Sequence, residues 1–310
     1  MNYNSLGDSG LKVSRVGLGG MTFGEHVSFE DTKKCIKFAV NCGVNLIDTA
    51  DCYSGGESEK FIGRSIKSIP RGDLVLASKC FFPMSEVPSN RGLSRKHIFD
   101  SVHKSLKNLG VDYLDIFQFH RYDSETPIIE SISAINDLIQ QGKILYWGLS
   151  RFDVREIEEI SMIISGDMKW HMPISNQWFC NLLSPGPGRE LMDCMLKNHI
   201  SFISYSPIAR GLFAEKFTKD PISILNLTMK EFERKRDILN SLANKLNLSL
   251  RRLALAWVLN NPRIASTLIG VSNINQLKEN IEVSGNRLTE EAINLISNTI
   301  NQMDLNRENY

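Results

Sequence analysis

The chain has 310 residues, of which 42% are hydrophobic and 23% charged, and its 36 Lys and Arg against 35 Asp and Glu give a formal net charge of +1. This is the composition of an ordered globular protein, and it lacks the basic excess of a nucleic-acid binder. The sequence contains no apolar run of the roughly 20 residues that a membrane helix needs. Residues 1–17 lack the apolar core of a secretory signal. We therefore expect a soluble cytoplasmic protein with no nucleic-acid or membrane partner.

The six cysteines predict neither disulfides nor a metal centre. They form no Cys-x-x-Cys pair and no cluster with histidine at the spacing of a zinc site. A chain of this size with a full hydrophobic complement does not need disulfides for stability, so reduced thiols are favoured. The cysteines are Cys35, Cys42, Cys52, Cys80, Cys180 and Cys194.

Short apolar runs alternate with amphipathic stretches along the chain. The first residues predict a small hairpin that turns at Gly7-Asp8 or at Ser9-Gly10. The predicted strands that follow are 13–19, 45–50, 73–79, 113–120, 143–150, 173–177, 200–206 and 266–272. The predicted helices are 32–43, 57–67, 94–110, 127–142, 154–165, 188–198, 229–260, 274–285 and 289–300, with an irregular stretch at 207–228.

Strict alternation of strands and helices predicts a parallel sheet, either an open doubly wound sheet or a closed barrel. Eight units of roughly 30–40 residues each favour the barrel. The fold class is therefore predicted as α/β, a (β/α)8 TIM barrel with a short N-terminal hairpin and an extra C-terminal helix. With no linker or change in composition, residues 1–310 are expected to form one domain.

A glycine-rich segment, GLGGMTFG at 17–24, follows the first predicted barrel strand. It differs from a dinucleotide-binding fingerprint because Thr22 takes the place of the third glycine and no helix begins at once. A tight turn at the end of the strand is the favoured interpretation, with glycines that let another group approach the backbone.

Three polar residues end successive apolar strands: Asp48, Lys79 and His120. Each alone has an ordinary interpretation, as a helix cap, a surface lysine or a core histidine. At the end of a buried strand, however, such groups are costly unless they pair with each other. Their recurrence at the same point of three units predicts a shared site at the carboxyl ends of the strands, where barrel enzymes carry their chemistry.

Tyr53 lies five residues after Asp48, in the loop before the next helix. A phenol has a pKa of about 10 and is a weak acid at neutral pH. A neighbouring lysine is expected to lower that pKa, and a carboxylate keeps the lysine charged. Asp48, Lys79 and Tyr53 therefore predict a proton-donating unit, and His120 can orient an acceptor oxygen.

With these residues in hand, the sequence resembles the aldo-keto reductase superfamily, in particular the bacterial Tas/YajO-type reductases and the potassium-channel β-subunit branch. The matching segments span nearly the whole chain: SRVGLGGMTFG, NLIDTADCYSGGESEKFIGRSIK, LVLASK, YLDIFQFHRYD, GLSR, SNQWFCNLL, YSPIARGLF, LALAWVLNNP and IGVSNINQLKEN. The combination of Asp-Thr-Ala-x-x-Tyr with a spaced lysine and histidine is highly specific.

The resemblance implies NADPH-dependent reduction of an aldehyde or ketone to an alcohol by hydride transfer. The family tetrad falls on Asp48, Tyr53, Lys79 and His120, with Tyr53 as the general acid. Channel β-subunits commonly carry Asn at the position of His120, which favours an active reductase over a regulatory subunit that retains NADP(H) with little turnover. A barrel lyase or isomerase with a Schiff base on Lys79 is the third alternative.

The resemblance also implies an extended NADPH/NADP+ site without a Rossmann domain. The carboxamide would lie against Ser150, Arg151 and Gln177, with Tyr205 stacked on the nicotinamide. Adenine and the 2′-phosphate would meet the helix after residue 270, where free N–H groups suit an anion. The implied cofactor-binding residues are Gly20, Met21, Ser150, Arg151, Gln177, Tyr205, Ser206, Pro207, Ile208, Arg210, Gly211, Lys216, Gly270, Ser272, Gln276, Glu279 and Asn280.

Two features leave the specificity open. Residues 270–275 carry no basic side chain where many relatives have one, so NADH is also possible. Substrate contacts are expected from the irregular segments: Met21, Phe23, the 80–93 loop with Phe81, Phe82 and Met84, Tyr122, Trp178, the 207–228 loop and the tail after Asn301. Their apolar bias indicates a small, partly hydrophobic carbonyl compound, although such side chains equally often serve as lid packing. The sequence does not predict the oligomeric state.

Overall fold

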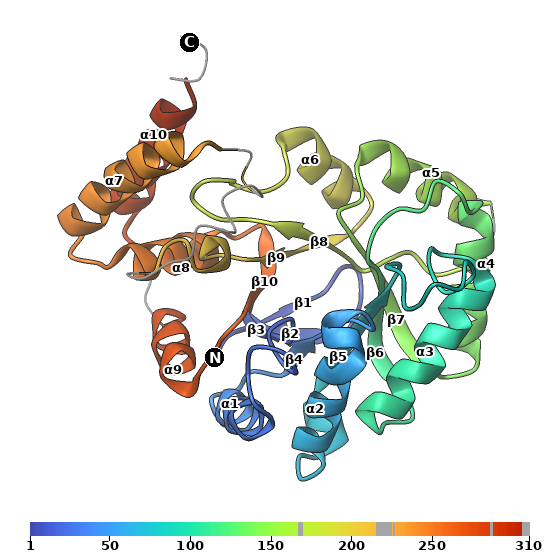
Figure 1. Ribbon diagram of the computed structural model, residues 1–310. Coiled ribbons are helices and arrows are strands. Elements are labelled where there is room, and N and C mark those ends of the chain that lie inside the picture. The colour runs from blue at the N-terminus through green and yellow to red at the C-terminus, as the bar shows by residue number, and fades with distance from the viewer. Residues whose placement is uncertain (167–169, 215–224, 226, 286–287, 306–310) are drawn as a thin grey trace.

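The computed structural model describes residues 1–166, 170–214, 225, 227–285 and 288–305. Eight parallel strands close into a barrel in the order β10-β3-β4-β5-β6-β7-β8-β9 (Figure 1). The strands are β3 (Val16–Gly19), β4 (Leu46–Asp48), β5 (Val75–Cys80), β6 (Leu114–Phe119), β7 (Ile144–Ser150), β8 (Ser175–Phe179), β9 (Ser201–Tyr205) and β10 (Ile264–Ile269). The predicted TIM barrel is confirmed.

Helices surround the barrel and follow its strands. They are α1 (Phe29–Asn41), α2 (Glu57–Ile66), α3 (Arg95–Leu109), α4 (Ile128–Gln140), α5 (Val154–Ser165), α6 (Arg189–Lys197), α7 (Met229–Lys245), α8 (Leu250–Asn260), α9 (Ile274–Val283) and α10 (Glu290–Leu305). Side-chain caps begin several of them, as the sequence predicts for α3: Ser94 accepts a hydrogen bond from the His97 N–H, and Gly110 ends the helix at a φ of 66°.

The predicted N-terminal hairpin is present as β1 (Tyr3–Ser5) and β2 (Lys12–Ser14), and its turn is closed by the Leu6 N–H on the Leu11 carbonyl at 3.0 Å. Leu6 and Val13 are fully buried in one apolar cluster with barrel side chains such as Leu46 and Ile116. The hairpin therefore covers the amino-terminal end of the barrel, and the carboxyl ends of the strands form the accessible end.

The hairpin is also joined to the last barrel strand. The Asn4 side-chain amide donates to the Ala265 carbonyl at 2.9 Å. The Ser266 hydroxyl donates to the Ser14 carbonyl at 2.7 Å. The first and last strands of the barrel, β3 and β10, pair directly beside these contacts.

The sequence predicts continuous helix over 229–260, and there the structure differs. The helix ends at Lys245 and a new one begins at Leu250. Asn247 takes a φ of 54° and Ser249 caps the second helix. α7, α8 and α10 share a second apolar core with Phe232, Leu253 and Ile296, beside the barrel (Figure 1). The extra C-terminal helix is thus confirmed, and it packs in this second core together with α7.

All six cysteines are free thiols, as predicted. Over the described ranges, no helix has the length and apolarity needed to cross a membrane.

Candidate functional site

The barrel brings the four predicted reaction-centre residues to one end of the sheet. Asp48 is the last residue of β4, Lys79 lies near the end of β5, and His120 directly follows β6. Parallel pairing sets Asp48 beside Ala77 and Lys79 beside Gln118. Tyr53 begins a short 3-10 turn, Tyr53–Gly56, in the loop after β4.

Asp48 and Lys79 form a buried ion pair. The side chain of Lys79 has no exposed area and that of Asp48 is 5% exposed. Lys79 Nζ donates to Asp48 Oδ1 and also to the Thr49 carbonyl at 2.8 Å. Burial alone would lower the pKa of Lys79, but the negative charge of Asp48 and its hydrogen bond to the ammonium outweigh burial, and the pKa lies above its usual value. Lys79 is therefore an ammonium. A lyase that forms a Schiff base needs the neutral amine of its lysine as the nucleophile, so a charged Lys79 disfavours that function.

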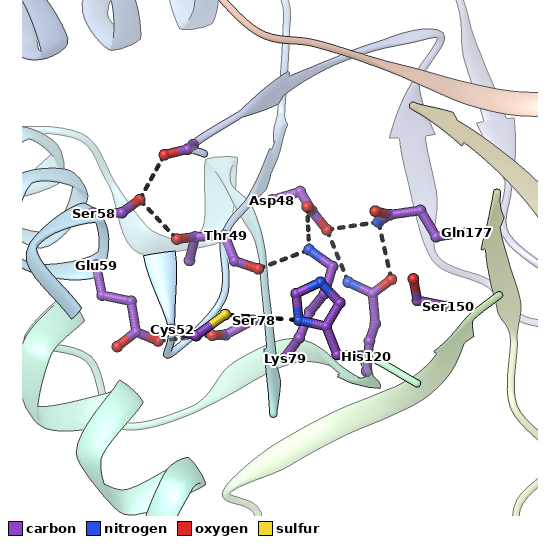
Figure 2. A network of polar contacts seen from close by, with 12 residues as sticks. Asp48, Thr49, Cys52, Ser58, Glu59, Ser78, Lys79, His120, Ser150 and Gln177 are labelled. Carbon is purple, nitrogen blue, oxygen red and sulfur yellow. Dashed lines mark hydrogen bonds and ion pairs between the residues drawn. The ribbon is translucent and has the colours of Figure 1, made fainter. Parts of the chain in front are cut away.

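The second carboxylate oxygen of Asp48 is held by two amides (Figure 2). Gln118 Nε2 donates to Asp48 Oδ2 at 2.8 Å, and Gln177 Nε2 donates to the same oxygen at 3.0 Å. Gln177 Nε2 also lies 3.2 Å from Gln118 Oε1. Asp48 is thus satisfied on both oxygens, a condition for keeping an ionised carboxylate buried. Sequence reasoning missed Gln118, whose only signal is a polar residue between two phenylalanines in a mostly apolar strand.

Tyr53 packs between the ion pair and His120. Lys79 Nζ lies 5.2 Å from the centre of the Tyr53 ring, and the rings of Tyr53 and His120 meet edge to face at 5.7 Å. Burial raises the pKa of the Tyr53 phenol, and the nearby charge of Lys79 opposes this only in part. The expectation of a lowered pKa is therefore wrong for the protein alone, because the loss of hydration outweighs an ammonium that Asp48 already neutralises. The phenol stays protonated, as a proton donor must be.

His120 is a neutral imidazole. Burial lowers its pKa to about 2, with Lys79 and Arg121 acting in the same direction. Cys52 Sγ lies 4.0 Å from His120 Nδ1. Burial raises the pKa of Cys52 to about 12, so its thiol keeps the proton that it can donate to Nδ1. When Cys52 donates in that contact, the imidazole hydrogen lies on Nε2 and His120 is a donor on its other edge.

The glycine-rich segment forms the predicted tight turn beside the site. The Gly20 N–H donates to the Asp48 carbonyl at 2.8 Å, and the Ser58 hydroxyl donates to the Gly20 carbonyl at 2.8 Å. A Cβ on Gly20 would lie 3.0 Å from both Ile62 Cδ1 and Ser58 Oγ. Glycine at this position therefore allows the turn to pack closely against α2.

The flanking residues divide into exposed and buried ones. Met21 is 44% exposed, whereas Phe23 is fully buried in the main core. The expectation that Phe23 contacts substrate is wrong, because its ring is covered by the protein itself. Tyr122 is half-buried, and its hydroxyl donates to Glu159 at 2.9 Å. Phe82 stacks edge to face on His120 at 4.8 Å between ring centres.

The residues expected around a nicotinamide lie on β7, β8 and β9 near their carboxyl ends or directly after them. Ser150 ends β7 and is buried, Arg151 is exposed with a φ of 62°, and Tyr205 ends β9. Gln177 lies on β8 but its amide is engaged by Asp48. The segment after β9 includes Pro207, Ile208 and Gly211, together with three non-glycine residues at positive φ: Ser206, Ala209 and Arg210. Such backbone conformations cluster at functional sites. Lys216 lies outside the described residues.

The residues expected around adenine gather at α9, with Gly270 just after β10. The backbone N–H of Ser272 donates to Gln276 Oε1 at 3.1 Å. Arg251, on α8, donates to Glu279 Oε2 at 2.8 Å and to Asn280 Oδ1 at 2.8 Å. Asn280 is 1% exposed, and its Nδ2 has no hydrogen-bond partner. A cavity of about 210 Å³ opens here, lined by Ser249, Arg251, Arg252, Leu255, Glu279 and Asn280.

Comparison with known proteins decides the family. The profile described as "Aldo/keto reductase family" matches residues 15–301. The chain is 34% identical to the "Versiconal hemiacetal acetate reductase" of Aspergillus parasiticus, over 94% of this chain and 95% of that protein. It is also 34% identical to a "Putative aryl-alcohol dehydrogenase" of Schizosaccharomyces pombe, over 94% and 93% of the two chains. It is 30% identical to a "Probable voltage-gated potassium channel subunit beta" of Oryza sativa subsp. japonica, over the full length of both.

The protein belongs to the aldo/keto reductase family. It is therefore an oxidoreductase, and enzymes of this family act on small carbonyl compounds with a nicotinamide cofactor. Over the described ranges, no group of three His, Cys, Asp or Glu side chains is arranged to hold a metal ion.

The α8–α9 region, where the sequence places the adenine side of a cofactor, contains a charged residue that sequence reasoning missed. Arg251 supplies a positive charge beside Glu279 and Asn280, although residues 270–275 supply none. Its signal in the sequence is the pair Arg251-Arg252 directly after the helix cap Ser249. The contact joins segments 25 to 29 residues apart, so helix periodicity alone does not reveal it.

Proposed function

We propose that this aldo/keto reductase uses NADPH to reduce an aldehyde or ketone to an alcohol, with Tyr53 as the proton donor. One observation carries the proposal: a protonated phenol packs against a buried, charged lysine and beside a neutral histidine. Lys79 lies 5.2 Å from the centre of the Tyr53 ring, and His120 lies 5.7 Å from it on another side. This is an arrangement suited to giving a proton to an oxygen that becomes negative.

Each residue has a role that follows from its protonation state. His120 presents Nε2–H to the carbonyl oxygen of the substrate and orients it. NADPH, when bound, supplies the hydride to the carbonyl carbon. Tyr53 donates its proton to the carbonyl oxygen. Lys79 stabilises the phenolate that remains, and Asp48 keeps Lys79 charged and in place. The phenolate recovers its proton from solvent.

The α8–α9 region supports NADPH as the cofactor. Arg251 offers a guanidinium that suits a phosphate. Asn280 Nδ2 is a buried donor without a partner, as expected where a ligand provides the acceptor. Ser272, Gln276 and Glu279 would complete the adenosine side, and Ser150, Arg151 and Tyr205 the nicotinamide side. NADH is the alternative cofactor, and measuring the activity with NADPH and with NADH side by side distinguishes the two.

Aromatic aldehydes are the first substrates to test. Relatives are named for aryl alcohols and for a hemiacetal acetate. Half-buried rings of Phe81, Phe82 and Trp178 lie near the ends of β5 and β8 and are available to an apolar substrate.

The test is Tyr53→Phe, with Tyr113→Phe as a control outside the site. We expect kcat/KM for aldehyde reduction to fall by about 10²–10⁴-fold in Tyr53→Phe, and NADPH affinity, measured by fluorescence titration, to change less than about twofold. Tyr113→Phe is expected to match the wild type. Wild-type turnover in Tyr53→Phe would remove Tyr53 from the mechanism.

A second candidate function is a regulatory subunit that binds NADP(H) with little turnover. Relatives from two plants and Schizosaccharomyces pombe named as potassium-channel β-subunits favour it. His120 favours the reductase. Tight NADPH binding without reduction of any aldehyde or ketone in a broad panel would support the regulatory function instead.

A further inference from the structure

Arg121 directly follows His120 and lies within the reaction centre. Its Nη1 donates to the His120 carbonyl at 2.5 Å and lies 3.5 Å from Ser150 Oγ. Its guanidinium carbon lies 5.6 Å from the centre of the Phe82 ring, which itself packs on the His120 ring. The phenols of Tyr205 and Tyr53 are close enough to affect its pKa. Arg121 therefore faces the same space as the proton donor.

The positive charge of Arg121 has no carboxylate partner in the part of the chain that the structure describes. The nearby acids are engaged elsewhere. Asp123 accepts from the Leu93 N–H at 2.7 Å and from the Thr126 hydroxyl at 2.7 Å. Glu159 accepts from Tyr122. A partly buried guanidinium usually pairs with an anion, so its position without one points to an anion supplied by a ligand.

Arg151 adds a second cation on the other side of Ser150. Its guanidinium carbon lies 5.4 Å from the centre of the Trp178 ring, and within the described ranges no ion pair engages it. The pKa of Arg121 lies below its usual value, first because of burial, and the nearby charge of Arg151 acts in the same direction. Two cations, Arg121 and Arg151, thus lie close to the aromatic rings of Phe82 and Trp178.

We propose that the substrate carries a carboxylate in addition to its reducible carbonyl, and that Arg121 binds that carboxylate. A planar guanidinium binds a carboxylate through two parallel hydrogen bonds, and one half-buried guanidinium matches one negative charge. Phe82 and Trp178 offer apolar surface to the part of the substrate between the two groups. This inference rests on the proposed reductase function and specifies its substrate class.

The test compares 2-, 3- and 4-carboxybenzaldehyde with their methyl esters, with NADPH as the reductant. For the best isomer, we expect the kcat/KM of the wild type to be at least about tenfold higher for the acid than for its ester, mainly because KM is lower. A tenfold ratio corresponds to about 1.4 kcal/mol, which is within the range of one charged hydrogen bond. Arg121→Gln is expected to reduce this ratio to about one. Arg121→Lys, which keeps the charge but not the planar fork, is expected to retain part of it.

The control is Arg155→Gln, whose side chain is 92% exposed on α5, and it is expected to keep the wild-type preference. Reduction of the esters at least as fast as the acids by the wild type would overturn the inference and leave the reductase function standing. An equal loss for acid and ester in Arg121→Gln would also overturn it, since that pattern indicates a structural role. No reduction of any aldehyde would overturn the reductase function and this inference together.

Discussion

The carboxyl ends of β4–β8 and the groove between α8 and α9 differ in how completely the chain satisfies its own polar groups. At the first, both oxygens of Asp48 and the ammonium of Lys79 have protein partners. At the second, the buried Nδ2 of Asn280 has none, and Arg251 is still 18% exposed. The comparison indicates a candidate reaction centre organised in advance by the fold and a second region whose polar groups are left incompletely satisfied, as expected of the proposed adenosine side.

The largest expected effect comes from breaking the organised network. Lys79→Met leaves the Asp48 carboxylate buried beside two amides but without its cation, so the free energy of unfolding is expected to fall by about 3–5 kcal/mol. Urea unfolding monitored by circular dichroism measures this change.

The double variant Asp48→Leu/Lys79→Met is its control. Because neither charge remains, we expect part of the lost stability to return while aldehyde reduction stays absent. A cost of less than about 1 kcal/mol for Lys79→Met alone would show that the network is not held together by this pair.

A medium effect comes from Asp51, an exception next to the organised network. Its Oδ2 accepts from the Ser101 hydroxyl at 2.5 Å, but its buried Oδ1 has no partner. Burial raises its pKa to about 7, with Glu59 acting in the same direction against the Ser101 hydrogen bond. The folded state therefore holds a proton that the unfolded state releases near pH 4, so this group's contribution to stability is lost as the pH rises from about 4 to 7.

Asp51→Asn is expected to raise the free energy of unfolding at pH 8 by about 1–3 kcal/mol, with little change at pH 4. Urea unfolding at both pH values, compared with the exposed control Asp112→Asn, isolates this effect. A difference in unfolding free energy between variant and wild type that does not grow with pH would contradict the Asp51 prediction.

His120 acts in the opposite sense: its lowered pKa makes the free energy of unfolding fall as the pH drops below about 6.5.

The smallest effect is expected at the open groove. Arg251→Gln should weaken NADPH binding about tenfold, or about 1.4 kcal/mol, because a charged hydrogen bond to the 2′-phosphate is lost. NADH affinity should change less than about twofold. Fluorescence titration of both cofactors, with exposed Arg263→Gln as the control, tests this. Equal weakening for NADH would place Arg251 away from the 2′-phosphate.

The sequence predicts the barrel and the proximity of four candidate catalytic residues because both depend on a repeated local pattern. Asp48, Lys79 and His120 occur where apolar strands end, and a parallel barrel brings such ends together. The partners of Asp48 are harder to predict. Gln118 is one of two polar residues, with Asp115, in a mostly apolar strand, and only strand pairing sets it beside Lys79.

Other features depend on burial, which the pattern does not measure. The pKa of Tyr53 rises because lost hydration outweighs a charge that Asp48 already balances. Phe23 follows a glycine turn, yet its ring is fully buried. The break between α7 and α8 contains neither glycine nor proline, and Asn247 adopts the positive φ instead. Each outcome is decided by tertiary contacts.

The hairpin β1–β2 has a consequence for the order in which the chain can fold. Ser14 and Asn4 bond to residues 252 and 261 positions later, beside the seam where β3 meets β10. Contacts of such long sequence separation form slowly. During synthesis, one edge of β3 therefore stays unpaired until β10, near the end of the chain, has been made. Completing the ring is a late event, and a truncation from either end that reaches β3 or β10 removes the same seam.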